Sequence, residues 1–164
     1  MTRGSVAWQK ISPTSGHIRI QGVYSNSDSY PVGLGNEVFS RVKDLGVLKT
    51  IEVLAKTKVW DIEYRHEDPK LFNPFRDPLF MEWIYLLKPV ELVVEVWKCV
   101  PVCKKLKAYC AEHGYTLSGR KHSYGHCVYT HLLVDTVKEH ETPDVAELEA
   151  KGHKLSEEAH ELEQ

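Results

Sequence analysis

An order of strand, helix, strand and strand occurs twice along this chain, and it constrains the fold more than any other feature. Apolar periodicity places the elements of the first unit at residues 17–24, 36–55, 59–65 and 79–87. The same reasoning places the second unit at residues 90–97, 101–114 and a hairpin around residues 122–125. We therefore expect an α+β fold: a mixed or antiparallel sheet made of two βαββ-like units, with helices packed on one face.

The predicted helix at residues 36–55 has a weak point in its middle. Asn36 is a good N-cap residue. Apolar residues then recur at helical spacing, at Val38, Val42, Leu45, Leu48, Ile51 and Ala55. Gly46 costs up to about 1 kcal/mol relative to alanine inside a helix. The pattern predicts one apolar face on a helix that can divide into two shorter pieces.

The C-terminal residues predict an amphipathic helix. Thr142, Pro143 and Asp144 form a good helix start. Apolar or small residues follow in a heptad-like stripe, at Val145, Leu148, Gly152, Leu155, Ala159 and Leu162. Such a stripe has to be buried against something. We expect residues 143–162 to pack on a second copy in a homodimer or on a partner protein. A helix folded onto its own body and a solvated tail are the alternatives.

Length and charge divide the chain into a body and a tail. The 164 residues fit a single α+β domain at 1–137, followed by an acidic helix or tail at 138–164. The body carries 18 basic and 14 acidic residues, whereas the tail carries three and nine. A basic body with an acidic tail is typical of polyanion-binding proteins, although ordinary solvated charge gives the same pattern.

The sequence also carries expectations about location. It contains no apolar run long enough to span a membrane and no recognisable signal peptide, so we expect a cytoplasmic or nuclear protein that is not secreted. The four cysteines are then expected to be reduced thiols.

Cysteine and histidine gather between residues 99 and 131, where all four cysteines and four histidines lie. Zinc prefers thiolate and imidazole ligands in a tetrahedral arrangement. The predicted zinc ligands are Cys110, His113 and Cys127, completed by His122 or His126. Two other interpretations stay open. The cysteines can be buried core residues, or Cys127 can be a nucleophile with His131 or His113 as its base.

Basic and aromatic residues alternate in the same region. Cations hold phosphates and aromatic rings stack on unpaired bases, so the mixture is typical of proteins that bind single-stranded nucleic acid or RNA. The predicted contact residues are Lys104, Lys105, Lys107, Tyr109, Arg120, Lys121 and Tyr124. The alternative is the solvated face of an amphipathic helix.

In organisation, this Cys/His cluster followed by a short heptad tail resembles the small cysteine-rich proteins of some plant RNA viruses. The likeness covers residues 99–162, and the N-terminal cysteine motifs of those proteins are absent from this sequence. The resemblance implies a suppressor of RNA silencing and assigns no residue a role.

Two classes of function remain. The first is a regulatory protein that binds nucleic acid, self-associates through its C-terminal helix and is stabilised by zinc. The second is an α+β enzyme or small-ligand-binding domain that uses a Cys/His site. No catalytic motif stands out in the sequence, which favours the first class.

Overall fold

The computed structural model of the chain describes residues 3–11, 13–14, 18–25, 28–56, 65–66, 81–118, 122–124 and 127–163. The described strands form one seven-stranded sheet in the order β3-β2-β1-β4-β5-β7-β6. Their bounds are β1 (Gly4–Ile11), β2 (Ile18–Ser25), β3 (Arg65–His66), β4 (Trp83–Lys88), β5 (Val93–Pro101), β6 (His122–Tyr124) and β7 (Cys127–Lys138). Strands β1 and β4 are parallel, and every other neighbouring pair is antiparallel.

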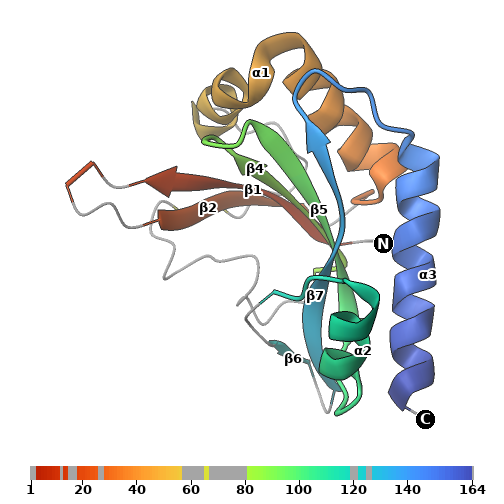
Figure 1. Cartoon of the computed structure of the whole chain (residues 1–164). Coiled ribbons are helices and arrows are strands. Elements are labelled where there is room, and N and C mark those ends of the chain that lie inside the picture. Colours follow the sequence, from red (N-terminus) through yellow and green to blue (C-terminus); the bar gives the residue numbers. More distant parts are fainter. Residues whose placement is uncertain are drawn as a thin grey trace.

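The helices lie on one face of this sheet (Figure 1). They are the short turn η1 (Pro31–Gly35), followed by α1 (Asn36–Lys56), α2 (Leu106–His113) and α3 (Val145–Glu163). Apolar residues of all these elements share one core with the facing side chains of the sheet. The predicted α+β class is therefore confirmed, with β2-α1-β3-β4 and β5-α2-β6-β7 as its two βαββ units.

The strands of the sheet agree with the sequence prediction except at two places. The pattern did not predict β1, which pairs with β2 and β4 at the middle of the sheet. The predicted strand at residues 59–65 lies outside the described residues, apart from Arg65 at the start of β3. A hairpin is present as predicted, but residues 122–124, which the pattern placed in its turn, form strand β6 and pair with residues 127–129 of β7.

Helix α1 is interrupted at Gly46, as the sequence predicted. This glycine has φ 84° and ψ 166°, which lies outside the helical region. The second half of α1 then begins at Val47, whose backbone N–H donates to Glu139 Oε2 at 2.9 Å. The interruption shifts the apolar face, so the predicted core positions Leu45 and Leu48 are exposed.

Helix α2 begins later than predicted. Pro101 ends β5, and the helix starts at Leu106 because residues 102–105 first turn the chain away from the sheet. Its predicted end is confirmed. Gly114 adopts φ 74°, and its N–H donates to the carbonyl oxygen of Cys110. A glycine suits this left-handed position.

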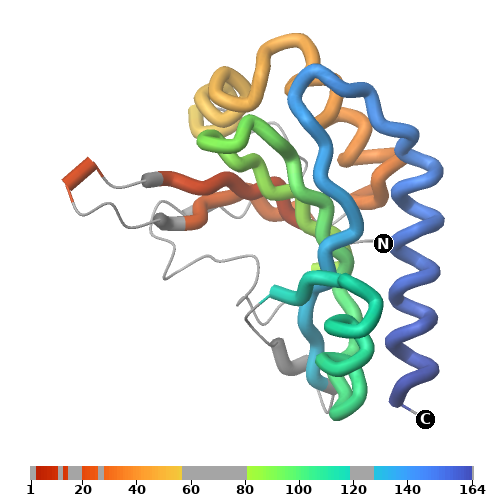
Figure 2. The backbone as a smooth tube through the Cα atoms, viewed as in Figure 1, coloured from red at the N-terminus to blue at the C-terminus, as the bar shows by residue number. Residues whose placement is uncertain are grey.

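Helix α3 runs along the sheet for its whole length (Figure 2). Asp144 caps its start, because its Oδ1 accepts the N–H groups of Ala146 and Glu147. The heptad-like stripe faces the chain's own sheet, where Leu148, Gly152, Leu155 and Ala159 are buried. The stripe is therefore covered within the chain, as in the alternative of a helix folded onto its own body, and association of residues 143–162 with a partner stays a prediction.

Helix α3 approaches the sheet closely at Gly152. A Cβ atom on this residue would lie 2.2 Å from Cη2 of Trp83, well inside van der Waals contact. Trp83 is fully buried on β4. Glycine therefore lets the helix backbone lie directly on the indole ring.

We predict that Gly152→Ala destabilises the protein by about 1–3 kcal/mol, although alanine is the better helix former. Urea unfolding of the purified protein measures the change. Trp83→Phe removes the clashing ring atoms, so the alanine substitution should cost less in that background. An unchanged or higher stability of Gly152→Ala would contradict the close packing of α3.

Candidate functional site

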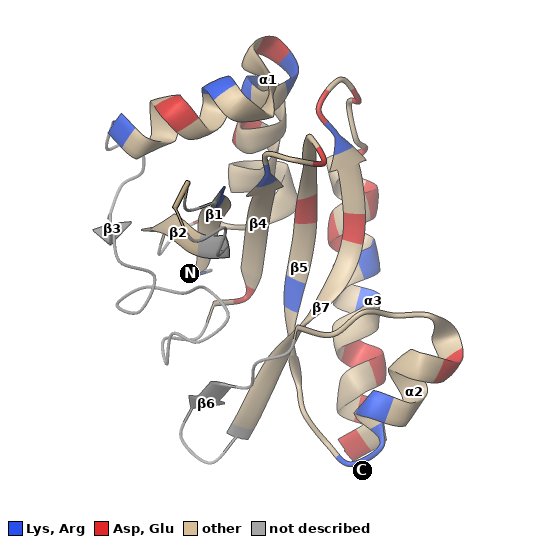
Figure 3. Cartoon of the chain, turned by 60° about the vertical axis from the view of Figure 1, so that its left-hand side comes forward, with Lys and Arg blue, Asp and Glu red and all other residues tan. Residues whose placement is uncertain are grey.

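The predicted basic residues of α2 and the turn before it lie in solvent. Lys104 and Lys105 occupy the turn, Lys107 lies in the first helical turn, and all three are exposed. Helix α2 lies at the end of the molecule where α3 finishes (Figure 3). Lysine side chains of this kind can reach phosphates without prior desolvation.

Three aromatic rings gather beside these lysines. The ring of His113 stacks on Tyr109 with centroids 4.0 Å apart, and it lies nearly parallel to Tyr115 at 5.9 Å. The two tyrosines are half-buried and His113 is exposed. We call Lys104, Lys105, Lys107, Tyr109, His113 and Tyr115 the α2 surface.

A hydrogen bond joins the α2 surface to helix α3. The hydroxyl of Tyr109 donates to Glu158 Oε2 at 2.8 Å. This hydrogen bond, together with partial burial, raises the pKa of Tyr109 to about 12. Tyr109 therefore remains protonated at neutral pH. Its hydroxyl is hydrogen-bonded to Glu158, and one face of its ring is covered by His113.

The other predicted nucleic-acid contacts cannot be placed on this surface. Arg120 and Lys121 lie outside the described residues, and the side chain of Tyr124 is not described. Of the predicted set, the structure brings together Lys104, Lys105, Lys107 and Tyr109. The sequence pattern assigned His113 to a metal site instead, yet His113 contributes the most exposed ring of the cluster.

The predicted zinc ligands on α2 face different surroundings. Cys110 is buried in the core, and this burial raises the pKa of its thiol. His113 is in solvent, where its Nδ1 donates to the carbonyl oxygen of Tyr109 at 2.9 Å. Among the described residues, no three His, Cys, Asp or Glu side chains form a group that could hold a metal ion. The side chains of Cys127, His122 and His126 lie outside that description.

Cys99 and His131 support the interpretation of buried core groups, whereas Cys103 is half-buried. Cys99 is buried on β5, and burial raises the pKa of its thiol to about 12. His131 lies opposite Cys99 on β7 and is buried as well. The Nε2 of His131 donates to the carbonyl oxygen of Met81 at 2.8 Å. A thiol with this pKa is a poor nucleophile at neutral pH.

Sequence reasoning missed a buried lysine on the helix-facing side of the sheet. Lys98 is only 6% exposed and lies opposite Trp83 on the neighbouring strand. Its Nζ lies 5.2 Å from the centroid of the indole ring, which is a cation–π contact. Burial lowers the pKa of Lys98, and the carboxylate of Glu82 partly offsets that effect. The signal in the sequence was a lone lysine inside the apolar run of β5.

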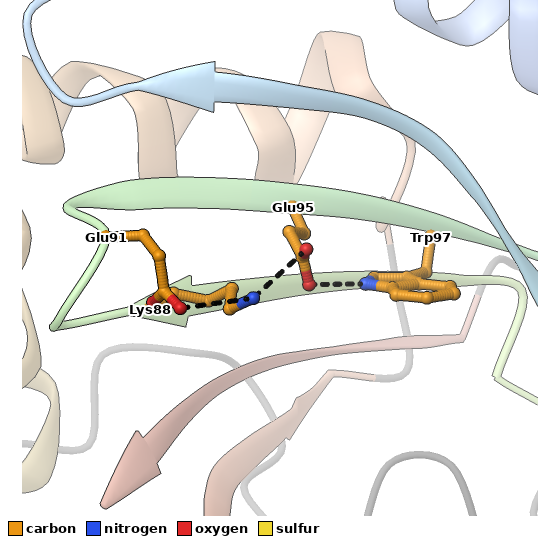
Figure 4. A network of polar contacts seen from close by, with 4 residues as sticks. All are labelled: Lys88, Glu91, Glu95 and Trp97. Carbon is orange, nitrogen blue, oxygen red and sulfur yellow. Dashed lines mark hydrogen bonds and ion pairs between the residues drawn. The ribbon is translucent and has the colours of Figure 1, made fainter. Parts of the chain in front are cut away.

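A second polar group on the sheet was also missed (Figure 4). Glu95 accepts a hydrogen bond from the indole N–H of Trp97 at 3.3 Å and lies 3.5 Å from Lys88 Nζ. Lys88 Nζ also lies 3.7 Å from Glu91 Oε1. These contacts satisfy the half-buried carboxylate of Glu95, so this network of four residues stabilises the sheet surface.

Within the described part of the chain, no helix is both long enough and apolar enough to cross a lipid bilayer.

We predict that Lys98→Met leaves the protein equally stable or more stable by roughly 1 kcal/mol at pH 7, because a buried charge is replaced by an apolar chain of similar length. The folded-state pKa of Lys98 is lowered, so the unfolded state binds more protons and the wild-type stability rises with pH. The difference between the two proteins should shrink as the pH approaches about 10. Chemical unfolding across this pH range measures it, and a strongly destabilised variant would contradict the prediction.

Comparison with known proteins assigns no family or function to this chain. No protein-family model matches the chain, and neither the curated proteins nor the solved structures contain a match.

Proposed function

We propose that this protein binds single-stranded nucleic acid through the α2 surface. The observation that carries the proposal is the exposure of Lys104, Lys105 and Lys107 beside the stacked rings of Tyr109 and His113. Cations and ring faces are the two components from which sequence-tolerant single-strand sites are built. The exposed ring of His113 is the group on which an unpaired base can stack, since its other face covers Tyr109.

Affinity at this site is expected to be modest and strongly dependent on salt. Three lysines neutralise few phosphates, and each contact releases condensed counterions when it forms. The C-terminal half of α3 adds Glu158 and further carboxylates at the same end of the molecule. Those carboxylates repel phosphates, so they favour a binding path over the lysine turn and away from α3.

The alternative, an enzyme or small-ligand-binding domain with a Cys/His site, has less support. Cys99 and Cys110 are buried, and burial raises the pKa of both thiols, so they are protonated at neutral pH. The nucleophile that the sequence suggested is Cys127, whose side chain is not described, and Cys103 is half-buried beside the core. The resemblance to silencing suppressors is compatible with the α2 proposal, because such proteins act on RNA.

A structural zinc ion stays a prediction of the sequence. The predicted ligands are Cys110, His113 and Cys127 with His122 or His126, and the core position of Cys110 speaks against its part in that set. Elemental analysis of the purified protein should give close to one zinc per chain if the prediction is right. Metal-free protein whose stability does not change on chelation would contradict it.

Self-association through residues 143–162 also stays a prediction, but its apolar stripe is already buried within the chain. A homodimer would have to use the acidic outer face of α3, and two such faces repel each other. Sedimentation at high micromolar concentration distinguishes a dimer from a monomer.

The nucleic-acid proposal predicts weaker binding by a triple variant, Lys104→Glu, Lys105→Glu and Lys107→Glu. Binding of a fluorescent single-stranded oligonucleotide should weaken by about ten-fold or more at low salt. The slope of log K against log salt should flatten by about 0.7 for each phosphate that the variant no longer neutralises. Fluorescence anisotropy measures both quantities.

A matched control carries the same change in net charge on α1, at Lys43, Lys49 and Lys56, which are all exposed. This control should bind like the wild type if the α2 surface is the site. Equal weakening in both triple variants would show that only net charge matters. No binding by the native protein at low salt would refute the proposed function.

A further inference from the structure

The outer edge of β7 changes partner along its length. At one end residues 127–129 pair with β6. In the middle the Ser118 N–H donates to the carbonyl oxygen of His131 at 2.8 Å, and the Leu133 N–H donates to that of Thr116 at 2.8 Å. The segment 116–118 therefore covers the edge at residues 131–133. Beyond residue 133 no described strand pairs with this side of β7, whereas the inner side remains paired with β5 as far as Lys138. We call residues 134–138 the open edge of β7.

Side-chain carboxylates occupy two backbone donors on the open edge. The N–H of Thr136 donates to Asp135 Oδ1 at 2.8 Å, and the N–H of Lys138 lies 3.4 Å from Glu141 Oε2. Both contacts are solvent-exposed and local. A carbonyl oxygen from an added strand could take the place of the Asp135 carboxylate on Thr136 without uncovering any core residue.

A hollow of about 490 Å³, open to solvent, lies beside this edge. It is bounded by residues 135–137 of β7, the connection at 141–144 and the first turns of α3. Val137 and Leu148 are buried and form its apolar floor. Such a floor suits a polypeptide with some apolar side chains better than a fully hydrated ion.

The charge around the hollow is acidic. Asp135, Glu141, Asp144 and Glu147 face a single cation, Lys151, among the lining residues. Asp135, Glu141 and Asp144 each use one carboxylate oxygen on a backbone N–H, so each has its second oxygen for a ligand, and Glu147 has both. Carboxylates repel the phosphates of nucleic acid and attract ammonium or guanidinium groups.

We propose that the open edge of β7 binds an extended, lysine- or arginine-rich segment of a protein partner, which adds a strand to the sheet. The unpaired edge selects an extended backbone, and the acidic rim selects basic side chains at alternate positions. A second copy of the chain is disfavoured as occupant, because α3 would bring its own carboxylates to the same rim. The proposal is independent of nucleic-acid binding at the α2 surface.

The test uses a fluorescein-labelled peptide of about eight residues, with lysine at every second position and valine or threonine between. We expect it to bind the full-length protein in fluorescence anisotropy and to weaken as salt rises. A peptide of the same sequence with alternate backbone amides N-methylated keeps its charge but cannot pair as a strand. That peptide should bind at least about ten-fold more weakly, because the backbone hydrogen bonds cannot form.

Protein variants locate the site. Glu141→Gln with Glu147→Gln should weaken peptide binding several-fold, whereas Glu161→Gln with Glu163→Gln, at the other end of α3, should not. Equal binding of the methylated and unmethylated peptides would overturn strand addition and leave a purely electrostatic contact. No binding at low salt would also overturn the proposal. The role of the carboxylates would then be to prevent the sheet edge from pairing with another chain. If the protein forms a dimer that the peptide dissociates, the edge is occupied by a second copy of the chain, and the choice of a foreign partner is overturned.

Discussion

The packing of α3 on the sheet at Gly152 and Trp83 is the contact on which the rest of the structure depends. It closes the core above β4 and β5, and it places a helix over Lys98, whose ammonium group lies against the same indole ring. A bulkier residue at position 152 would lift the helix and let water reach the lysine. The pairing of β4 with β5 sets the cation–π contact, and the packing of α3 adds to the burial that lowers the pKa of Lys98 and places Glu158 near Tyr109.

The apolar periodicity of the sequence was sufficient to predict most strands of the sheet and helix α3. It failed to predict the buried face of α1, where a single residue changes the direction of the helix backbone. Gly46 interrupts α1, so Val47 and Leu54 enter the core while Leu45 and Leu48 turn outward. A period counted through the glycine cannot reveal that shift, since it depends on the backbone angles of a single residue. Strand β1 was missed because its residues are buried on both faces and do not alternate in polarity.

The candidate site was only partly predictable for a related reason. Exposure of Lys107 follows from its place outside the apolar face of α2, and that of Lys104 and Lys105 from the turn before the helix. The stacking of His113 on Tyr109 follows from their i, i+4 spacing on α2, whereas the position of Tyr115 beside both rings depends on the end of the helix at Gly114. The lone lysine in the apolar run of β5 was a signal for Lys98, but its burial depends on β5 lying inside the sheet, which the sequence pattern did not establish.

The position of α3 after all seven strands has a consequence for synthesis on the ribosome. Strand β1 pairs in parallel with β4, and its Gly4 lies opposite Trp83, so this central pairing must wait until about half of the chain has been made. Even then the helix-facing side of the sheet, with Trp83 and Lys98, stays uncovered until residue 152 has left the exit tunnel. The nascent chain therefore carries an open apolar face through much of its translation, and this is the stage at which it is most exposed to misassembly and most dependent on chaperones.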